Sequence, residues 1–108
     1  MIVSNEPGYY EQGNFGIRIE NLLLLRKAHP KPLCTTSKSS SPVQKVDFLS
    51  FQPLTMIPIQ KKMIVLEMLT PAEREYLNLY HSSVRELIGP LLQSEEERQW
   101  LYDSTKPL

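Results

Sequence analysis

A β-hairpin is predicted at the start of the chain by residues 1–26, MIVSNEPGYYEQGNFGIRIENLLLLR. Residues 1–5 and 16–26 have the composition of strands, and the Pro-, Gly- and Asn-rich stretch between them predicts a long turn. Side chains alternate between the two faces of an extended chain, so Arg18 and Glu20 are expected on the same face. The sequence therefore places a cation beside a carboxylate on the second strand.

The middle of the chain predicts a polar loop and one further strand. Residues 27–47 are rich in Pro and Ser and have no hydrophobic period, which indicates a flexible loop. Residues 48–55, FLSFQPLT, predict a strand in which Pro53 marks an edge or an end. Extended chain is expected to continue from there to Met68.

Two helices are predicted in the last third of the chain by capping-box patterns. Thr70 is followed by Pro at the first helical position and by Glu73 three residues later, and Ser94 is followed by Glu97. Gly89-Pro90 should weaken or end the first helix. One apolar stripe at three- and four-residue steps predicts the buried face of that helix: Leu77, Tyr80, Val84, Leu87, Ile88 and Leu91.

The expected fold class is α+β, with an antiparallel hairpin and a further strand followed by C-terminal helices. The chain has 108 residues, with 12 Lys and Arg against 12 Asp and Glu, so neither nucleic acid nor a membrane surface is an expected partner. The longest apolar run, Leu22 to Leu25, is too short to span a bilayer, and no signal segment precedes it. A single cysteine, Cys34, fits a reducing compartment, so the expected localisation is cytoplasmic.

Glu6 and Glu20 are the residues through which the hairpin could carry chemistry. Glu6 ends the first strand and Glu20 lies in the second, so pairing of the strands can bring the two carboxylates close together. Two such charges need a cation, a shared proton or open water between them, and a divalent metal with hard oxygen ligands is the natural cation. Exposed glutamates beside turns are common, so these two residues alone do not define a metal site.

Two seven-residue stretches carry a resemblance to a known family. SNEPGYY at 4–10, followed by FGIRIEN at 15–21, is similar almost letter for letter to the last two metal-ligand segments of the pita-bread metallopeptidases of the Xaa-Pro aminopeptidase (aminopeptidase P) type. The stretch FQPLTMIPIQKKMI at 51–64, a Tyr-His pair in the helix and a Trp-Leu pair near the end resemble the C-terminal extension of the larger members. Two features differ from the family: the loop at 27–47 is longer, and Gln52 stands where Glu is expected.

The resemblance implies a role for each matching residue. Glu6 would bind one metal ion and Glu20 would bridge both ions of a dinuclear centre. Arg18 would hold the ligand carboxylates by charge-assisted hydrogen bonds, and Tyr10 would donate to the substrate or to a ligand oxygen. For Tyr10, an aromatic ring packed beneath a loop is an equally good interpretation.

The resemblance also implies a division of the chain. Residues 1–26 would be the end of the catalytic domain, residues 27–47 a flexible loop, and residues 48–108 the C-terminal extension. The strand-like beginning without a preceding element predicts a fragment. The larger members use this region for dimer contacts, so a homodimer is expected.

The activity implied for the whole enzyme is removal of the first residue from peptides with proline in second position. Two divalent ions, usually Mn²⁺, would hold and deprotonate the attacking water. The other ligands, two Asp and one His, are expected upstream of Met1, and neither His29 nor His81 follows the family's histidine motif. The chain alone is therefore expected to be inactive and to bind no metal firmly.

A different interpretation is a non-catalytic dimerisation or protein-binding module of the pita-bread type. Intact Glu6 and Glu20 argue against a lineage that has given up its metal. An Asp, Asp and His in family order upstream of Met1 in the coding sequence would distinguish a peptidase fragment from a free-standing module.

Overall fold

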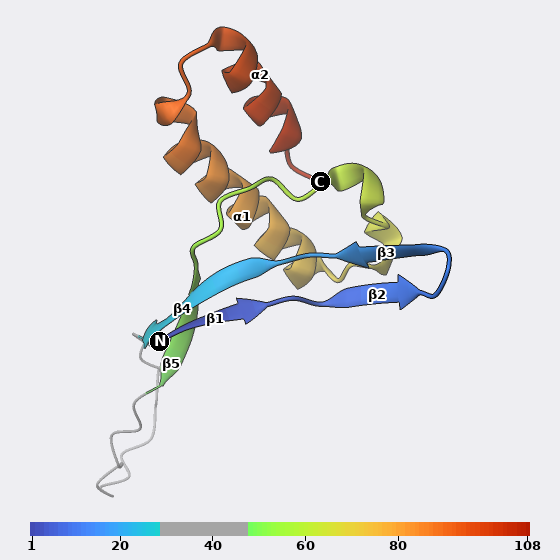
Figure 1. Ribbon diagram of the computed structural model, residues 1–108. Coiled ribbons are helices and arrows are strands. Elements are labelled where there is room, and N and C mark those ends of the chain that lie inside the picture. Colours follow the sequence, from blue (N-terminus) through green and yellow to red (C-terminus); the bar gives the residue numbers. More distant parts are fainter. Residues whose placement is uncertain (29–47) are drawn as a thin grey trace, which may run out of the picture. The chain divides into compact units, whose positions relative to one another are not determined.

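The computed structural model describes residues 1–28 and 48–108, in which strands are followed by helices (Figure 1). The chain divides into two compact units, Met1–Thr55 and Met56–Leu108. The predicted α+β class, antiparallel sheets followed by C-terminal helices, is confirmed. Cys34 and nearly all of the predicted loop lie outside the described residues. No helix within the described ranges is long and apolar enough to cross a membrane.

A three-stranded antiparallel sheet in the first unit joins β1 (Ile2–Asn5), β4 (Asn21–Lys27) and β5 (Leu49–Pro53) in the order β1-β4-β5. Pro53, at the end of β5, stands opposite Leu23 of β4. Proline has no N–H to donate, so this position at the end of an outer strand is the one that a sheet tolerates. The strand predicted at 48–55 is thereby confirmed.

A second antiparallel pair is formed by β2 (Gly8–Glu11) and β3 (Phe15–Arg18). The turn between them places Gly13 at φ 73°, where glycine is favoured because it has no Cβ. The long turn predicted between the strands is therefore wrong, because Gly8–Glu11 pairs as a strand. The single strand predicted over 16–26 is also divided, with β3 ending at Arg18 and β4 beginning at Asn21, and β4 continues to Lys27, the first residue of the predicted loop.

The second unit is built on the helices α1 (Pro71–Ile88) and α2 (Glu95–Ser104), and both predicted capping boxes are confirmed. The Thr70 hydroxyl accepts from the Glu73 N–H at 3.3 Å, and the Glu73 carboxylate accepts from the Thr70 N–H at 2.8 Å. The Thr70 hydroxyl also donates to the Glu73 carboxylate at 2.7 Å, and this bond, followed by the one from the Thr70 N–H, lowers the pKa of Glu73. The first helix ends as predicted, passing into the 3₁₀ turn η3 (Gly89–Leu91).

The extended chain predicted up to Met68 is contradicted by two 3₁₀ turns, η1 (Lys61–Met63) and η2 (Leu66–Met68). The Met63 N–H donates to the Gln60 carbonyl at 3.2 Å, and a similar bond closes η2. Single 3₁₀ turns satisfy very few backbone groups and have no strong residue pattern. The hydrophobic periodicity of the sequence therefore does not predict these two turns.

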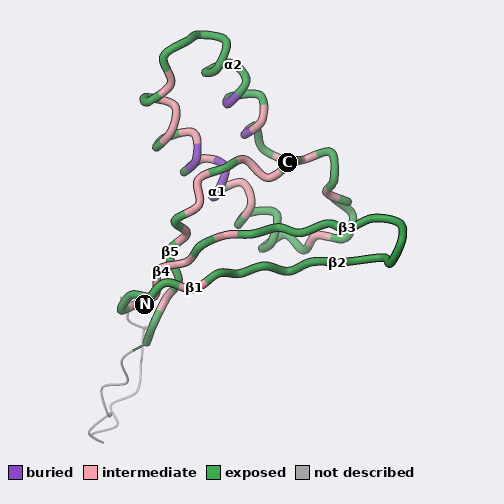
Figure 2. Tube along the Cα trace, viewed as in Figure 1, coloured by how far each residue is buried: buried purple, intermediate pink, exposed green. Residues whose placement is uncertain are grey.

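The core of the second unit lies where α1 faces α2, as the purple segments of Figure 2 show. Tyr80, Val84 and Leu101 are buried, and four partly buried apolar residues pack around them: Met56, Ile59, Ile88 and Leu92. Leu87 and Leu91 are 57% and 73% exposed, so the predicted buried stripe is too wide. One facing helix and a short extended segment cover only a narrow strip of α1.

Two consecutive side chains of α1 hold the extended segment that opens the second unit. The Tyr80 hydroxyl donates to the Ile57 carbonyl at 2.9 Å, and the Ile59 N–H donates to Nε2 of His81 at 3.0 Å. His81 is fully buried, and its Nδ1 has no hydrogen-bond partner in the described parts of the chain. Burial, reinforced by the positive charge of Lys61, lowers the pKa of His81.

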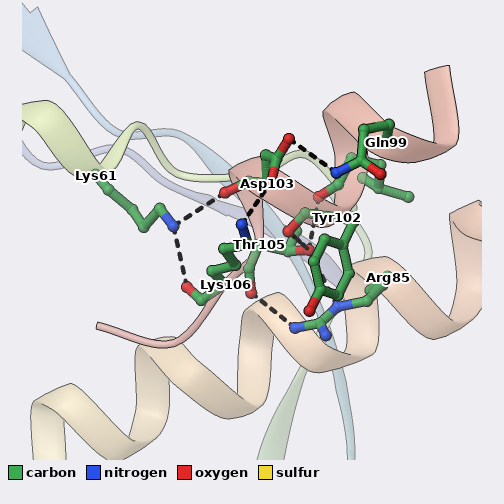
Figure 3. Close-up of polar contacts among 8 residues, drawn as sticks. Lys61, Arg85, Gln99, Tyr102, Asp103, Thr105 and Lys106 are labelled. Atoms are coloured by element: carbon green, nitrogen blue, oxygen red, sulfur yellow. Dashed lines mark hydrogen bonds and ion pairs between the residues drawn. The ribbon is translucent and has the colours of Figure 1, made fainter. Parts of the chain in front are cut away.

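Two cations hold the C-terminal end of α2, where helix carbonyls lack partners within the helix (Figure 3). The Arg85 guanidinium donates to the Thr105 hydroxyl at 3.1 Å and to the Thr105 carbonyl at 2.8 Å. Lys61 Nζ donates to the carbonyls of Asp103 at 3.1 Å and Lys106 at 3.2 Å. Lys61 and Arg85 therefore have a structural role, because their hydrogen bonds tie η1 and α1 to the end of α2.

Acidification is expected to destabilise the second unit through His81. Its pKa is lowered on folding, so below the ordinary histidine value of about 6.5 the unfolded chain binds more protons than the folded chain. Stability is therefore full above about pH 6.5 and falls as the pH decreases, by at most about 1.4 kcal/mol per pH unit for one proton. Urea unfolding at a series of pH values, followed by the fluorescence of Trp100 in α2, measures this effect.

Two variants distinguish the contribution of His81 to the pH dependence of stability from that of His29. His81→Gln should abolish the pH dependence of stability between about pH 5 and pH 7, whereas His29→Gln should leave it unchanged. An undiminished pH dependence in His81→Gln would contradict the assignment.

Candidate functional site

The candidate site lies in the first unit, between the β1–β4 strand pair and the β2–β3 strand pair. Pro7, which has no N–H, lies between β1 and β2, where the pairing with the opposite strands is interrupted, and its carbonyl accepts from the Ile19 N–H at 3.1 Å. Glu6 directly precedes Pro7, and Glu20 directly follows Ile19. Both carboxylates therefore flank one interruption, on opposite strands.

Arg18 connects the two carboxylates. Its guanidinium nitrogens lie 4.0 Å from Oε2 of Glu6 and 3.4 Å from Oε2 of Glu20. The three side chains are 40–50% exposed, so solvent screens these pairs and each adds little to stability. What the geometry provides is proximity, because a single cation holds both acids.

Tyr10 extends the cluster on the same face of the hairpin. Its hydroxyl is the main cause that raises the pKa of the Arg18 guanidinium. Glu20 and then Glu6 add to the rise through their negative charges. The four residues singled out in the sequence therefore come together as one cluster.

The cluster fits part of a metal site. Two carboxylates supply the hard oxygen atoms that divalent cations such as Mn²⁺ prefer. Within residues 1–28 and 48–108, no group of three or more His, Cys, Asp or Glu is placed to hold a metal ion. The described residues therefore hold two potential ligands and an arginine that balances their charge.

The other sequence candidates lie elsewhere. His81 is buried in the second unit, where it accepts a hydrogen bond from the backbone, and His29 lies outside the described residues. Gln52, which replaces the expected Glu, accepts from Arg26 across the β4–β5 pair. It is therefore engaged in strand pairing.

Two glycines of the site were missed by reasoning from sequence. Gly8 and Gly16 lie against the ring of Tyr10. The sequence predicts Gly8 in the turn and Gly16 at the start of the second strand, with no role at the site for either, although the alternation of Glu6, Gly8 and Tyr10 is a signal that the polar face continues along the strand.

Comparisons with known proteins identify the family of the chain. A protein-family model described as the C-terminal region of peptidase M24 matches residues 47–108. Aminopeptidase P2 of Arabidopsis thaliana is 45% identical over 108 residues, which is all of this chain and 14% of that protein. Aminopeptidase P1 of Lotus japonicus is 41% identical over 108 residues, again all of this chain and 15% of that protein.

A solved structure is also similar. The X-prolyl aminopeptidase from Caenorhabditis elegans, described as a cytosolic enzyme with a di-nuclear active site, matches with a TM-score of 0.80 and 33% identity. The match covers 99% of this chain and 16% of that one.

The chain thus spans 14% to 16% of the length of these relatives. The family model covers more than half of the chain, and the relatives match along all or nearly all of it. The resemblance inferred from the two seven-residue motifs is confirmed. The chain belongs to the peptidase M24 family and corresponds to the C-terminal region of its aminopeptidase P members.

Proposed function

We propose that the chain supplies the last two carboxylate ligands of a dinuclear Xaa-Pro aminopeptidase centre. The observation that carries this proposal is the shared contact of Arg18 with Glu6 and Glu20. Glu6 would bind one divalent ion and Glu20 would bridge two, with Mn²⁺ the expected metal. The ions, when bound, supply a deprotonated water for attack on the peptide bond before proline.

The chain's own residues orient these ligands. Arg18 restrains both carboxylates and offsets their mutual repulsion. Tyr10, which lies on β2 and raises the pKa of Arg18, would donate to the substrate or to a ligand oxygen. In this assignment residues 1–26 complete the catalytic domain and 48–108 form the extension. A cytoplasmic location is supported by the relative described as cytosolic.

The isolated chain is expected to show no release of the first residue from a Xaa-Pro peptide above background. Two carboxylates do not complete a dinuclear centre, and the chain matches only 16% of the solved relative. A peptidase assay with added Mn²⁺ measures this directly. Manganese-dependent turnover by the 108-residue chain would refute the expectation.

A chimaera tests the ligand roles where the rest of the enzyme is present. This chain replaces the matching region of the C. elegans X-prolyl aminopeptidase, and the product should retain activity. Glu6→Gln and Glu20→Gln should each reduce kcat/KM by more than about 100-fold, the upper range for loss of a group that only supports a ligand. Gln52→Glu, in the strand pair β4–β5, is the matched control and should leave activity unchanged.

Metal binding by the isolated chain should be weak. Hard divalent cations take about six or more oxygen ligands, and Glu6 and Glu20 supply only two side chains. Titration calorimetry with Mn²⁺ should show no tight, stoichiometric binding. Tight binding that disappears in Glu20→Gln would show that the described cluster is already a complete site.

A second candidate function is that of a dimerisation or protein-binding module, with a second copy of the chain as partner. It is favoured by apolar side chains left exposed along one face of α1 and η3: Tyr76, Leu79, Leu87 and Leu91. Their spacing of three, eight and four residues keeps them on one side of a helix. Balanced charge continues to favour neither nucleic acid nor a membrane surface as a partner.

Light scattering over a wide concentration range tests the homodimer. The mass should rise from 12.5 kDa towards twice that value as concentration increases. Leu87→Glu should keep the chain monomeric because it places a charge in the apolar contact, whereas Glu75→Gln on the same helix should not. A mass that stays at 12.5 kDa throughout would contradict association.

A further inference from the structure

The β2–β3 hairpin carries two glycines that the metal-ligand proposal leaves unexplained. Gly8 stands opposite Arg18, and Gly16 stands opposite Tyr10. Directly opposed residues, and residues two apart on one strand, share a face of the sheet. Tyr10, Arg18 and both glycines therefore lie on one face.

The ring of Tyr10 occupies the space that a side chain at either glycine would need. A Cβ at Gly8 would lie 2.6 Å from the Tyr10 hydroxyl and 2.9 Å from the nearest ring carbons. A Cβ at Gly16 would lie 2.8 Å from Cδ1 of the same ring. Carbon atoms do not approach so closely, so any other residue at these positions would displace the ring.

Backbone conformation does not explain the two glycines. Among the described glycines, Gly13 in the turn is the one with positive φ, and it has open space where a Cβ would be. Gly8 and Gly16 have ordinary strand conformations that any residue adopts. Glycine normally weakens a strand, and a cross-strand aromatic ring laid over it offsets part of that loss.

We infer that Gly8 and Gly16 are positioning residues of the candidate metal centre, because together they form a flat cradle in which the Tyr10 ring presents its hydroxyl to Arg18. Arg18 in turn contacts both carboxylates, at 4.0 Å for Glu6 and 3.4 Å for Glu20. The cradle thus acts through Tyr10 and Arg18 on the ligands. The role in catalysis rests on the proposed function, whereas the cradle itself does not.

NMR of the 108-residue chain tests the cradle without metal. A ring stacked over a glycine shields its Hα protons, so the Gly8 and Gly16 signals should be shifted upfield relative to those of Gly13. Tyr10→Phe keeps the ring and should keep the shift, and Tyr10→Leu should abolish it. Unshifted glycine signals in the wild-type chain, or an upfield shift that survives Tyr10→Leu, would overturn the inference.

A double-mutant cycle tests the action on Arg18. Gly16→Ala should move the side-chain Nε–H resonance of Arg18 in the same direction as Tyr10→Phe, because both remove the hydroxyl from the guanidinium. In a Tyr10→Leu background, Gly16→Ala should no longer move this resonance. An equal shift in both backgrounds would show that the ring is not the link.

A matched glycine provides the control. A Cβ at Gly89 would lie 3.8 Å from Leu101, which is ordinary contact. Gly89→Ala should therefore leave the Arg18 resonance where it is in the wild-type chain. A shift as large as that of Gly16→Ala would overturn the specific role of the cradle.

The chimaera with the C. elegans enzyme distinguishes the positioning role of the two glycines from the proposed ligand role of Glu20. At saturating Mn²⁺, Gly8→Ala and Gly16→Ala should lower kcat by about 10- to 100-fold, the range for losing a partner of a metal ligand, with Gly89→Ala unchanged. Activity that falls in Glu20→Gln but not in Gly16→Ala would overturn the positioning role. Activity that survives Glu20→Gln would instead refute the proposed function, and the NMR result would still decide the cradle.

Discussion

Two carboxylates brought to one place on a hairpin repel each other unless a cation lies between them, and in this chain Arg18 supplies that cation. Its guanidinium is within 4.0 Å of Glu6 and Glu20, which flank the interruption of the strand ladder. The other features of the first unit serve this contact. Pro7 lies beside the acids where strand pairing is interrupted, and Tyr10, on the strand paired with that of Arg18, raises the pKa of the guanidinium. Strand pairing therefore brings the two carboxylates together, and the charge of Arg18 offsets their repulsion.

The exposed positions of these side chains have a chemical consequence. At 40–50% exposure, the ion pairs are screened by water and stabilise the fold very little. These ion pairs therefore do not account for the stability of the fold, and the proposed role of the carboxylates is to bind metal. A divalent cation with hard oxygen ligands is the species that such a pair of acids suits. The family to which the chain belongs includes a relative described as having a di-nuclear active site, which agrees with this chemistry.

The second unit is stabilised in a different way, by fixing the ends of its elements. Both long helices begin with reciprocal capping boxes, and α2 ends against Lys61 and Arg85. The extended segment at Ile57 and Ile59 is held by Tyr80 and His81 of α1. The buried core is small, so these hydrogen bonds to otherwise unpaired backbone groups contribute much of the stability of the second unit. Because burial lowers the pKa of His81, the stability of the second unit is sensitive to acid.

The sequence by itself determined the family, the α+β class, both helix starts and the four residues of the candidate site, because caps and the two motifs are local patterns. It did not determine that Gly8–Glu11 is a strand, that η1 and η2 are turns, or that Leu87 and Leu91 are exposed. Those outcomes depend on partners distant in sequence: β3 pairs with β2, and α2 covers only a narrow strip of α1. Only the tertiary structure could show that the Tyr10 ring lies against Gly8 and Gly16, since that contact needs two strands in one register.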